Sequence, residues 1–320
     1  MNKIYLGVDI GGTSIKYGLV SEDGIILKKN SFLVDNNLDQ YSIIEKLSNE
    51  LNLFIKENNL EHYMIEGVGI GCPGSVNSEE GICDYSNNLK WHDLPVKQII
   101  ENNCKIKCKI SNDANAATLG EMKFGIGKNY KNAIMLTLGT GVGGGIIING
   151  FLYEGNEGKG AELGHSTLRI NGRKCTCGRR GCIEAYASAS ALIKDGIRAM
   201  KKEKKSSLWE RTNYNPYNLN GKILLEEAKK EDQTALKVFN EYCNYLKEAI
   251  LNYCNVFRPE LIVLGGGISA QKDMLINTIE PMLEKEYYGF KNTPKVELKC
   301  AELGNDAGII GAASLIIFNS

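Results

Sequence analysis

Apolar and polar positions along the chain follow two different periods, which predicts a mixed α/β protein. Short apolar runs at Ile4–Ile10, Ile65–Ile70 and Leu261–Leu264 each lead into glycines, as buried strands do where the chain turns. Residues 38–57 place their apolar side chains three and four positions apart, which is the spacing of an amphipathic helix. By the same criteria we predict further strands at Ser14–Val20, Ile25–Asn30, Lys105–Ile110, Ala133–Leu138, Gly145–Ile148 and 295–299, and helices at 114–122, 184–201, 221–230, 232–256, 271–284 and 306–318.

One arrangement, a strand, a glycine turn and a second strand, occurs at residues 4–20 and again at 133–148. Helical sequence follows each copy, which is typical of α/β domains. The repetition suggests two similar domains with a glycine hairpin from each at a cleft. We expect a smaller α/β domain of residues 1–113 plus 306–320, and a larger one of residues 114–305. Residues 201–220 are charged, then polar and aromatic, and predict a surface segment without an assigned role.

Charge and hydropathy exclude several classes of protein. The 320 residues contain 38 Lys and Arg against 38 Asp and Glu, so the net charge is zero and general nucleic-acid binding is disfavoured. Residues 132–153 carry no charge, and Gly141 and Gly145 have the spacing of a helix–helix motif in lipid. Their central glycine tract instead favours two short strands, so we expect no membrane partner. The N-terminal apolar run is interrupted by Asp9, unlike a signal peptide, which predicts a cytoplasmic protein.

Three glycine-rich segments are candidates for phosphate binding. The first turn offers the backbone N–H groups of Gly11 and Gly12 and the hydroxyl of Thr13, with Lys16 on the next strand, whereas Asp9 has the carboxylate that a magnesium ion prefers. A tight hairpin with a local Asp9 turn is the simpler alternative.

The other two segments follow later strands. The second, Gly139–Gly145, formally matches the dinucleotide fingerprint G-x-G-x-x-G and includes Thr140 and Gly141. A strand follows it rather than a helix, which argues against a nicotinamide dehydrogenase and favours a phosphate hairpin. The third segment, Gly265, Gly266 and Gly267, separates a strand from a predicted helix start and admits a flat ring or a phosphate.

Asp113 lies between a predicted strand and a predicted helix, in the sequence Ser111-Asn112-Asp113-Ala114. Ser, Asn and Asp are the preferred residues at a helix N-cap, and physical reasoning alone favours that role. A carboxylate at the carboxyl end of a strand is also where α/β folds bind ligands, and it can accept a proton from a substrate hydroxyl.

Three cysteines and one histidine form the most specific pattern. Cys175, Cys177 and Cys182 fall within eight residues, and His165 precedes them by ten. Three thiolates and an imidazole make a closed tetrahedral zinc site, which would be structural rather than catalytic. A redox cysteine pair is disfavoured because the spacing is C-x-C rather than C-x-x-C. Glu184 begins the next helix, where a carboxylate complements the helix dipole, and Glu162 is alternatively a solvated surface charge.

Taken together, these segments resemble the sugar kinases of the ROK (repressor, ORF, kinase) family. The stretch from Cys72–Asn77 through Asn88–Trp91 looks most like the bacterial glucokinase branch of that family. The resemblance rests on Asp9–Thr13, Asn112–Ala116, Leu138–Gly144, Glu162–His165, Cys175–Glu184 and Gly304–Ala312, in the family's order over nearly the whole chain. It implies an actin-like (ribonuclease H-like) α/β fold of two domains with ATP, magnesium and a sugar in the cleft between them. It also implies a homodimer or homotetramer and a structural zinc ion.

The resemblance also implies roles for particular residues. Asp113 would be the general base of the reaction, in place of a mere cap. The sugar would be bound by Gly74, Asn88, Asn112, Glu162, His165 and Glu184. The nucleotide, its phosphates and magnesium would lie near Asp9, Gly11, Gly12, Thr13, Lys16, Thr140, Gly141, Gly265, Gly266 and Gly267. His165 would bind zinc through one ring nitrogen and orient the other toward a sugar hydroxyl.

Some residues depart from the family pattern. Members often carry an acidic residue where Ser111 stands, a proline where Asn87 stands and a glycine where Ala161 stands. The expected reaction is phosphorylation of glucose to glucose 6-phosphate, with N-acetylmannosamine, N-acetylglucosamine or fructose as alternative substrates. A repressor of the same family would carry a helix-turn-helix segment before the first strand, and here that strand begins at residue 4. A sugar sensor without catalysis is the other alternative, although Asp113 and the phosphate segments are all present.

Overall fold

A computed structural model describes residues 3–35, 37–61, 64–289 and 293–318, which form two compact units. The first unit comprises residues 1–132, 145–161 and 302–320, and the second comprises residues 133–144 and 162–301. This division differs from the predicted boundary after residue 113. The reason is that helix α3 (Asp113–Phe124) packs on the last helix, α10 (Ala307–Ile317), and so belongs to the first unit.

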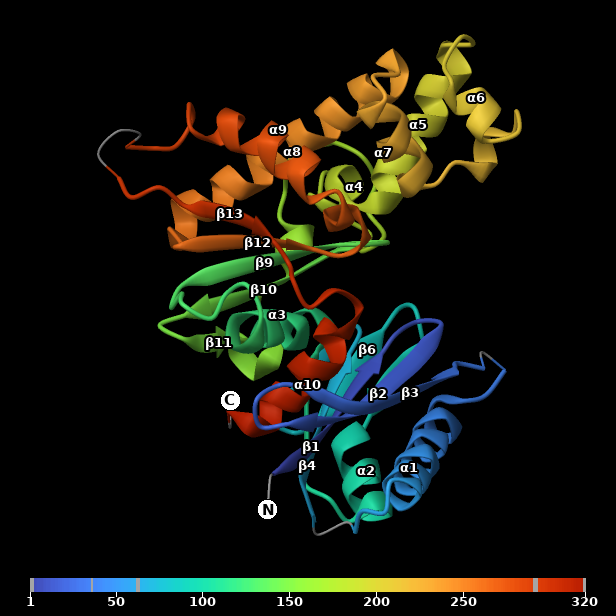
Figure 1. Cartoon of the computed structure of the whole chain (residues 1–320), viewed down its shortest axis with the longest axis vertical. Coiled ribbons are helices and arrows are strands. Elements are labelled where there is room, and N and C mark those ends of the chain that lie inside the picture. Colours follow the sequence, from blue (N-terminus) through green and yellow to red (C-terminus); the bar gives the residue numbers. More distant parts are fainter. Residues whose placement is uncertain (1–2, 36, 62–63, 290–292, 319–320) are drawn as a thin grey trace. The chain divides into compact units, whose positions relative to one another are not determined.

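The first unit is built on a five-stranded sheet of order β3-β2-β1-β4-β8 (Figure 1). Its strands are β1 (Ile4–Ile10), β2 (Ser14–Ser21), β3 (Ile26–Leu33), β4 (Ile65–Cys72) and β8 (Cys108–Asn112). β1 to β3 form an antiparallel meander, whereas β4 and β8 run parallel to β1. The carboxyl ends of β1, β4 and β8 therefore lie at one edge of the sheet.

Alternation along β1 buries both faces of this sheet. Leu6, Val8 and Ile10 join the core that includes residues of α1 (Gln40–Glu57) and α2 (Val96–Cys104). Tyr5 points the other way and packs with Ile309 of α10. Because successive strand side chains alternate between faces, Asp9 lies on the face that α10 covers.

The first unit also contains two short-stranded elements that the sequence did not predict. β5 (Ser75–Asn77), β6 (Ile82–Ser86) and β7 (Trp91–Leu94) form a small antiparallel sheet. β11 (Phe151–Tyr153) pairs with the end of β10 (Val142–Ile148) as a hairpin. The four unpredicted strands, β5, β6, β7 and β11, have only three to five residues and lack long apolar runs, so their pattern is weak.

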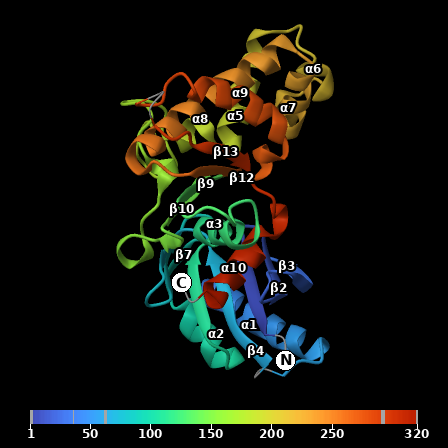
Figure 2. The same cartoon turned by 60° about the vertical axis from the view of Figure 1, so that its left-hand side comes forward.

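The second unit contains the parallel neighbours β9 (Ala133–Leu138), β12 (Leu261–Gly265) and β13 (Glu297–Cys300). Helix α9 (Lys272–Leu283) packs against β13, and α8 (Gln233–Phe257) packs against α9 and α7 (Gly221–Lys229) (Figure 2). The predicted helix 184–201 is divided into α4 (Glu184–Ala187) and α5 (Ala189–Lys202). Ser188 between them is extended, and its hydroxyl caps α5 by accepting a bond from the backbone N–H of Ala191.

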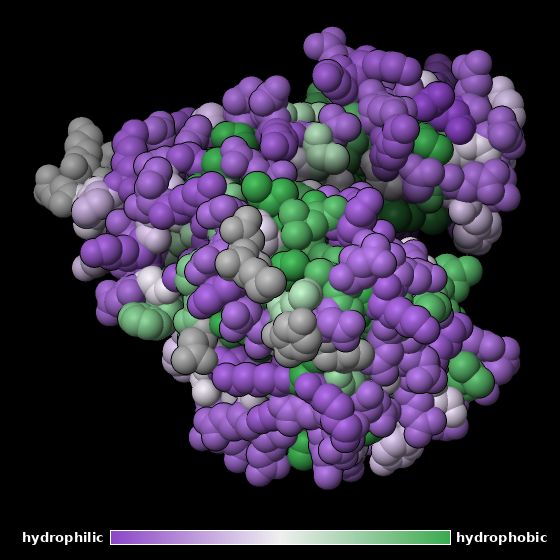
Figure 3. Space-filling view, turned by 60° about the horizontal axis from the view of Figure 1, so that its bottom comes forward, coloured by the Kyte–Doolittle hydropathy of each residue, from purple (hydrophilic) through white to green (hydrophobic). Residues whose placement is uncertain are grey.

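Residues 201–220 are only partly a surface segment. They include α6 (Leu208–Arg211), and the Leu208 side chain is fully buried. The Trp209 indole N–H lies within hydrogen-bonding distance of the carbonyls of Met200 and Glu203. Tyr214 and Tyr217 are exposed. The face of the molecule drawn in Figure 3 is mainly hydrophilic, with smaller hydrophobic patches. Within the described ranges, no helix combines the length and apolarity needed to cross a membrane.

Candidate active site and metal centre

The first glycine turn places Asp9 beside Lys16. Gly11, Gly12 and Thr13 connect β1 to β2, and the Gly11 N–H donates to the carbonyl of Ser14 over 3.0 Å. The register of the two strands pairs Asp9 with Lys16, and the Lys16 Nζ lies 3.8 Å from a carboxylate oxygen of Asp9. Burial raises the pKa of Asp9, and the Lys16 charge opposes that shift. A carboxylate oxygen fits the hard cation Mg²⁺, so the predicted magnesium-side role is chemically consistent.

Asp113 begins α3 directly after β8, at the carboxyl edge of the parallel strands. The helix cap is supplied by Asn112, whose side-chain oxygen accepts bonds from the N–H groups of Ala114 and Asn115 over 2.9 and 3.3 Å. The segment is thus capped as its sequence suggests, but the cap is Asn112 and not Asp113, for which the role was predicted. One Asp113 oxygen also accepts a bond from the Ala114 N–H, over 2.9 Å. The half-buried Asp113 carboxylate stands where α/β folds bind ligands.

Of the predicted sugar residues, Gly74 contacts the start of α3, whereas Asn88 lies near the first glycine turn. The Asn112 amide donates to the carbonyl of Gly74 over 3.0 Å, which ties the loop after β4 to the start of α3. Gly74 has φ +107°, and a methyl group there would lie 2.1 Å from the carbonyl oxygen of Tyr85, so glycine is required. Asn88 is exposed, and its Cβ is 3.6 Å from where a methyl group on Gly12 would lie.

Sequence reasoning missed one polar residue next to Asp113. The buried Ser111 hydroxyl donates a 2.5 Å hydrogen bond to the carboxylate of Glu154, whose other oxygen accepts a 3.4 Å bond from Ser78. Glu154 follows β11, 43 residues after Ser111. The sequence offered one signal for this contact, which is that Ser111 stands where family members often carry an acidic residue. In the structure the Glu154 carboxylate, from elsewhere in the chain, contacts that position.

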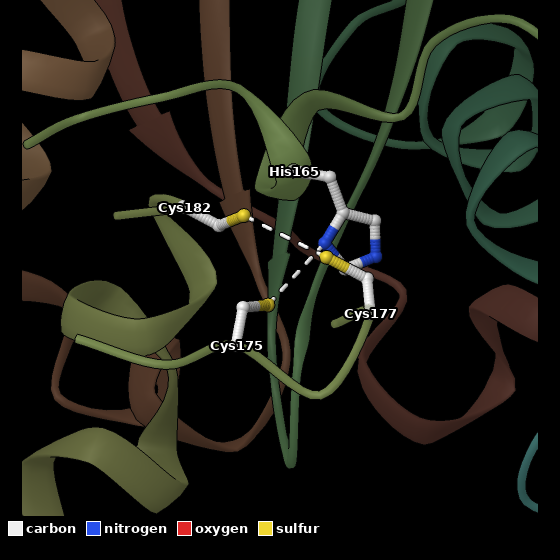
Figure 4. Close-up of side chains that lie close together, drawn as sticks. All are labelled: His165, Cys175, Cys177 and Cys182. Atoms are coloured by element: carbon white, nitrogen blue, oxygen red, sulfur yellow. Dashed lines mark hydrogen bonds between the residues drawn. The ribbon is translucent and has the colours of Figure 1, made fainter. Parts of the chain in front are cut away.

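The four predicted zinc ligands come together in the second unit. One candidate ligand atom each of His165, Cys175, Cys177 and Cys182 lies within 4.8 Å of all the others (Figure 4). The Sγ of Cys175 is 3.6 Å from Nδ1 of His165, and the Sγ atoms of Cys177 and Cys182 are 3.7 Å apart. Ligands of a tetrahedral zinc ion lie about 3.6 Å apart for a nitrogen–sulfur pair and about 3.8 Å for two sulfurs. The cluster therefore fits a closed zinc site.

The thiols of the cluster differ in how readily they ionise. Burial raises the pKa of the Cys175 thiol to about 12, so a bound metal has to displace its proton. Burial also acts on Cys177, but hydrogen bonds from the Arg179 backbone and from Cys175 and Cys182 outweigh it and lower the pKa of that thiol. The Nδ1 of His165 faces the sulfurs, and its other ring nitrogen lies on the opposite side of the ring (Figure 4).

Glu184 joins this cluster to the second glycine hairpin. One carboxylate oxygen accepts bonds from the Thr176 hydroxyl over 2.7 Å and from the Cys175 thiol over 3.4 Å. The other accepts a bond from the backbone N–H of Val142 over 3.2 Å. A methyl group on Gly141 would lie 2.4 Å from that second oxygen. Glu184 is the first residue of α4, as predicted, and these contacts give it more than a helix-dipole role.

Glu162 lies immediately before a short turn, Leu163–His165, that carries the metal-facing histidine. The buried Tyr253 hydroxyl donates a 2.6 Å bond to the carbonyl of Leu163 and so supports this turn from helix α8. Much of the Glu162 surface is exposed, yet loss of solvent around its carboxylate raises its pKa, an effect that His165 opposes and Glu184 reinforces. The simpler interpretation of Glu162 as an isolated solvated charge is therefore incomplete.

The remaining glycine segments behave differently from each other. Gly139, the exposed Thr140 and Gly141 form the turn between β9 and β10, and the rest of the glycine segment already belongs to β10. A strand after the turn contradicts the dinucleotide fingerprint and confirms the hairpin. Gly266 has φ +84°, and a methyl group there would lie 2.5 Å from the Leu138 carbonyl oxygen. After Gly265 the chain forms a 3₁₀ turn at Gly267–Ala270, and α9 begins only at Lys272. The start of α9 therefore agrees to within one residue with the helix predicted from residue 271.

Comparisons with known proteins identify the class to which these features belong. A glucokinase from Streptomyces griseus, solved with glucose and AMPPNP, matches 98% of this chain and 98% of its own with a TM-score of 0.85 and 30% identity. The chain accordingly has the actin-like, two-domain α/β fold of sugar kinases, as predicted.

The family follows from the sequence matches. The family model described as "ROK family" matches residues 5–318, and the chain belongs to this family. It is 39% identical over 316 residues to a glucokinase from Thermotoga maritima, which covers 97% of this chain and 96% of that protein. It is also 31% identical over 321 residues to the xylose repressor of Bacillus subtilis, covering 98% of this chain and 76% of the repressor.

Proposed function

We propose that this protein is an ATP-dependent hexokinase-type phosphotransferase that converts glucose to glucose 6-phosphate. The observation that carries the proposal is the position of Asp113 at the carboxyl end of β8, where Asn112 acts as the helix cap. The similarity to the T. maritima and S. griseus glucokinases supports glucose as the substrate.

In this proposal Asp113 acts as the general base. Its carboxylate accepts the proton of the 6-hydroxyl of glucose as that oxygen attacks the γ-phosphorus of ATP, and ADP leaves in line. The base must hold its place because proton transfer and attack occur together. The Asn112 cap and its bond to the Gly74 carbonyl hold the first turn of α3 and thereby restrict the Asp113 backbone.

Binding of the phosphates falls to the glycine turns. Gly11, Gly12 and Thr13 offer N–H and hydroxyl donors in the first unit, with Lys16 beside them, and Thr140 and Gly141 do so in the second. Gly265, Gly266 and Gly267 lie beside the nucleotide. Asp9 would hold Mg²⁺, which when bound neutralises charge on the transferred phosphoryl group.

As the family resemblance implies, binding of the sugar is assigned to Gly74, Asn88, Asn112, Glu162, His165 and Glu184. A structural zinc ion held by His165, Cys175, Cys177 and Cys182 would close the loop that carries the last three of these sugar residues. With Nδ1 on the metal side, the other ring nitrogen of His165 carries the proton and is a donor of fixed orientation for a sugar hydroxyl.

The test is ADP release from ATP and magnesium over a sugar panel: glucose, mannose, fructose, allose, N-acetylglucosamine and N-acetylmannosamine. The Asp113→Asn variant serves as the blank, and its turnover on glucose is expected to fall by about 10²–10⁴-fold with sugar binding retained. A preference for an N-acetyl sugar or for fructose would overturn the substrate while leaving the mechanism. Near-normal turnover of Asp113→Asn would remove the general base.

A sugar-responsive protein without catalysis is the second candidate, favoured by the similarity to the B. subtilis xylose repressor. Zero turnover on every sugar by folded wild-type protein that still binds glucose would support it. A cytoplasmic location and a homodimer or homotetramer remain predictions, and the oligomeric state is measurable by sedimentation.

A further inference from the structure

Helix α10 is a candidate for a role beyond packing. It starts within Gly304–Ala312 (GNDAGIIGA), a segment that carries the family resemblance but has no role in the function proposed above. The helix contains Gly308 and Gly311, and α3 contains Gly120. Glycine inside a helix is unfavourable relative to alanine, so its presence at these three positions calls for a compensating contact.

The contact at Gly308 is the carboxylate of Asp9. A methyl group on Gly308 would lie 2.4 Å from Cγ and 2.6 Å from Oδ2 of Asp9. Gly7, two residues before Asp9 on the same face of β1, also lies close to α10. A methyl group on Gly7 would lie 2.0 Å from the carbonyl oxygen of Ile309. The first turn of α10 therefore rests directly on the backbone of β1 and on the Asp9 side chain.

The contact at Gly311 is the backbone of α3. A methyl group there would lie 1.9 Å from the carbonyl oxygen of Ala116, and one on Gly120 would lie 2.9 Å from the Cα of Gly311. The two helices thus touch backbone to backbone, and Figure 1 shows them side by side. Since α3 begins at Asp113, its axis determines where that carboxylate stands.

We propose that α10 is a positioning element, in which Gly308 sets the Asp9 carboxylate and Gly311 with Gly120 sets the start of α3 and hence Asp113. The proposal rests on the function proposed above, because it takes Asp9 as the magnesium-side carboxylate and Asp113 as the base. In this proposal each of the three glycines acts through the residue or backbone that it allows to approach.

A double-mutant cycle between Gly308→Ala and Asp9→Gly tests the first contact. Gly308→Ala displaces the carboxylate and is expected to weaken binding of Mg·ADP, measured by calorimetry, about tenfold or more, with glucose affinity unchanged within about twofold. In the Asp9→Gly background the three atoms nearest to the new methyl group, all of them in the Asp9 side chain, are gone. In that background Gly308→Ala should not weaken Mg·ADP binding further, and it should lower the melting temperature less than it does in the wild type.

The matched control is Ser314→Ala, on the same helix. Ser314 is fully buried, and its hydroxyl bonds only to the Ile310 carbonyl among the contacts described, over 2.8 Å. It should lower the melting temperature and leave Mg·ADP binding unchanged. The proposal fails if Ser314→Ala weakens Mg·ADP binding as much as Gly308→Ala does. It also fails if Gly308→Ala weakens Mg·ADP binding by the same factor with and without the Asp9 side chain.

The second contact is tested with Gly311→Ala, and with the milder Gly120→Ala should the first variant not fold. Either is expected to lower kcat about tenfold or more, while the affinities for glucose and Mg·ADP stay within about twofold. An unchanged kcat in a folded variant would overturn this part. Absence of sugar phosphorylation by the wild type would instead refute the proposed function, and the stability cycle between Gly308 and Asp9 would still decide the first contact.

Discussion

The hydroxyl of Ser111 donates a 2.5 Å hydrogen bond to the carboxylate of Glu154. Ser111 precedes the proposed general base, Asp113, by two residues. Ser111 is almost fully buried, and Glu154 reaches it from the loop after β11. A hydrogen bond to an ionised acceptor is stronger than a neutral one, and here it ties the end of β8 to a distant loop.

We therefore expect Glu154→Gln to lower kcat with glucose. The neutral amide accepts a weaker bond from Ser111, so the strand end that presents Asp113 is held less firmly; a loss of about three- to tenfold is expected. Steady-state kinetics of glucose phosphorylation is the measurement. Glu157→Gln is the matched control, since Glu157 is exposed in the same loop and bonds to Lys159. Equal kinetics of the Glu154 variant and this control would contradict the role.

The cysteine cluster predicts one zinc ion per chain. Chelation, or Cys177→Ser, should release the ion and loosen the loop from Glu162 to Glu184, because the ligand atoms bridge its two ends. Metal analysis should find the zinc, and glucose affinity should fall about tenfold or more on its removal. Cys300→Ala, a buried cysteine outside the cluster, is the control and should retain the metal. Folded wild-type protein free of zinc would refute this account.

Replacement of Asp9 is expected to stabilise the fold and to impair function. Burial raises its pKa, so the folded state disfavours the charged form. The charged Asp9 carboxylate therefore lowers the free energy of unfolding at any pH above its pKa in the folded protein. This destabilisation disappears as the pH falls from the folded pKa to the pKa of Asp9 in the unfolded chain. Asp9→Asn should therefore raise the melting temperature at pH 7 by about 1–3 °C while weakening magnesium-dependent turnover.

The sign of this effect is tested by thermal denaturation at several pH values. The stability gain of Asp9→Asn should shrink as the pH falls toward the unfolded pKa of an aspartate, about 3.9. Glu22→Gln, a change at an exposed acid after β2, should show no comparable gain. A variant less stable than wild type at pH 7 would show that the pairing with Lys16 outweighs burial.

Local patterns in the sequence were sufficient to predict much of the secondary structure and the cysteine cluster. The apolar run of β1 and its terminal glycines predicted that strand correctly, and the spacing over residues 38–57 predicted α1 to within two residues of its start. The cysteine spacing predicted a cluster that the structure brings together. These features depend on neighbours in sequence, since strand alternation, helix periodicity and a short metal loop are all local.

Only the tertiary structure decided which distant groups meet. The serine at position 111 showed that an acid is missing there but did not identify Glu154 as its replacement, and the segment at Gly304–Ala312 did not indicate that Gly308 lies against Asp9. The break at Ser188 and the buried Leu208 depend likewise on packing within the second unit rather than on periodicity. The sequence thus determined the longer strands, the main helices and the chemistry available, whereas long-range packing decided which side chains hold that chemistry in place.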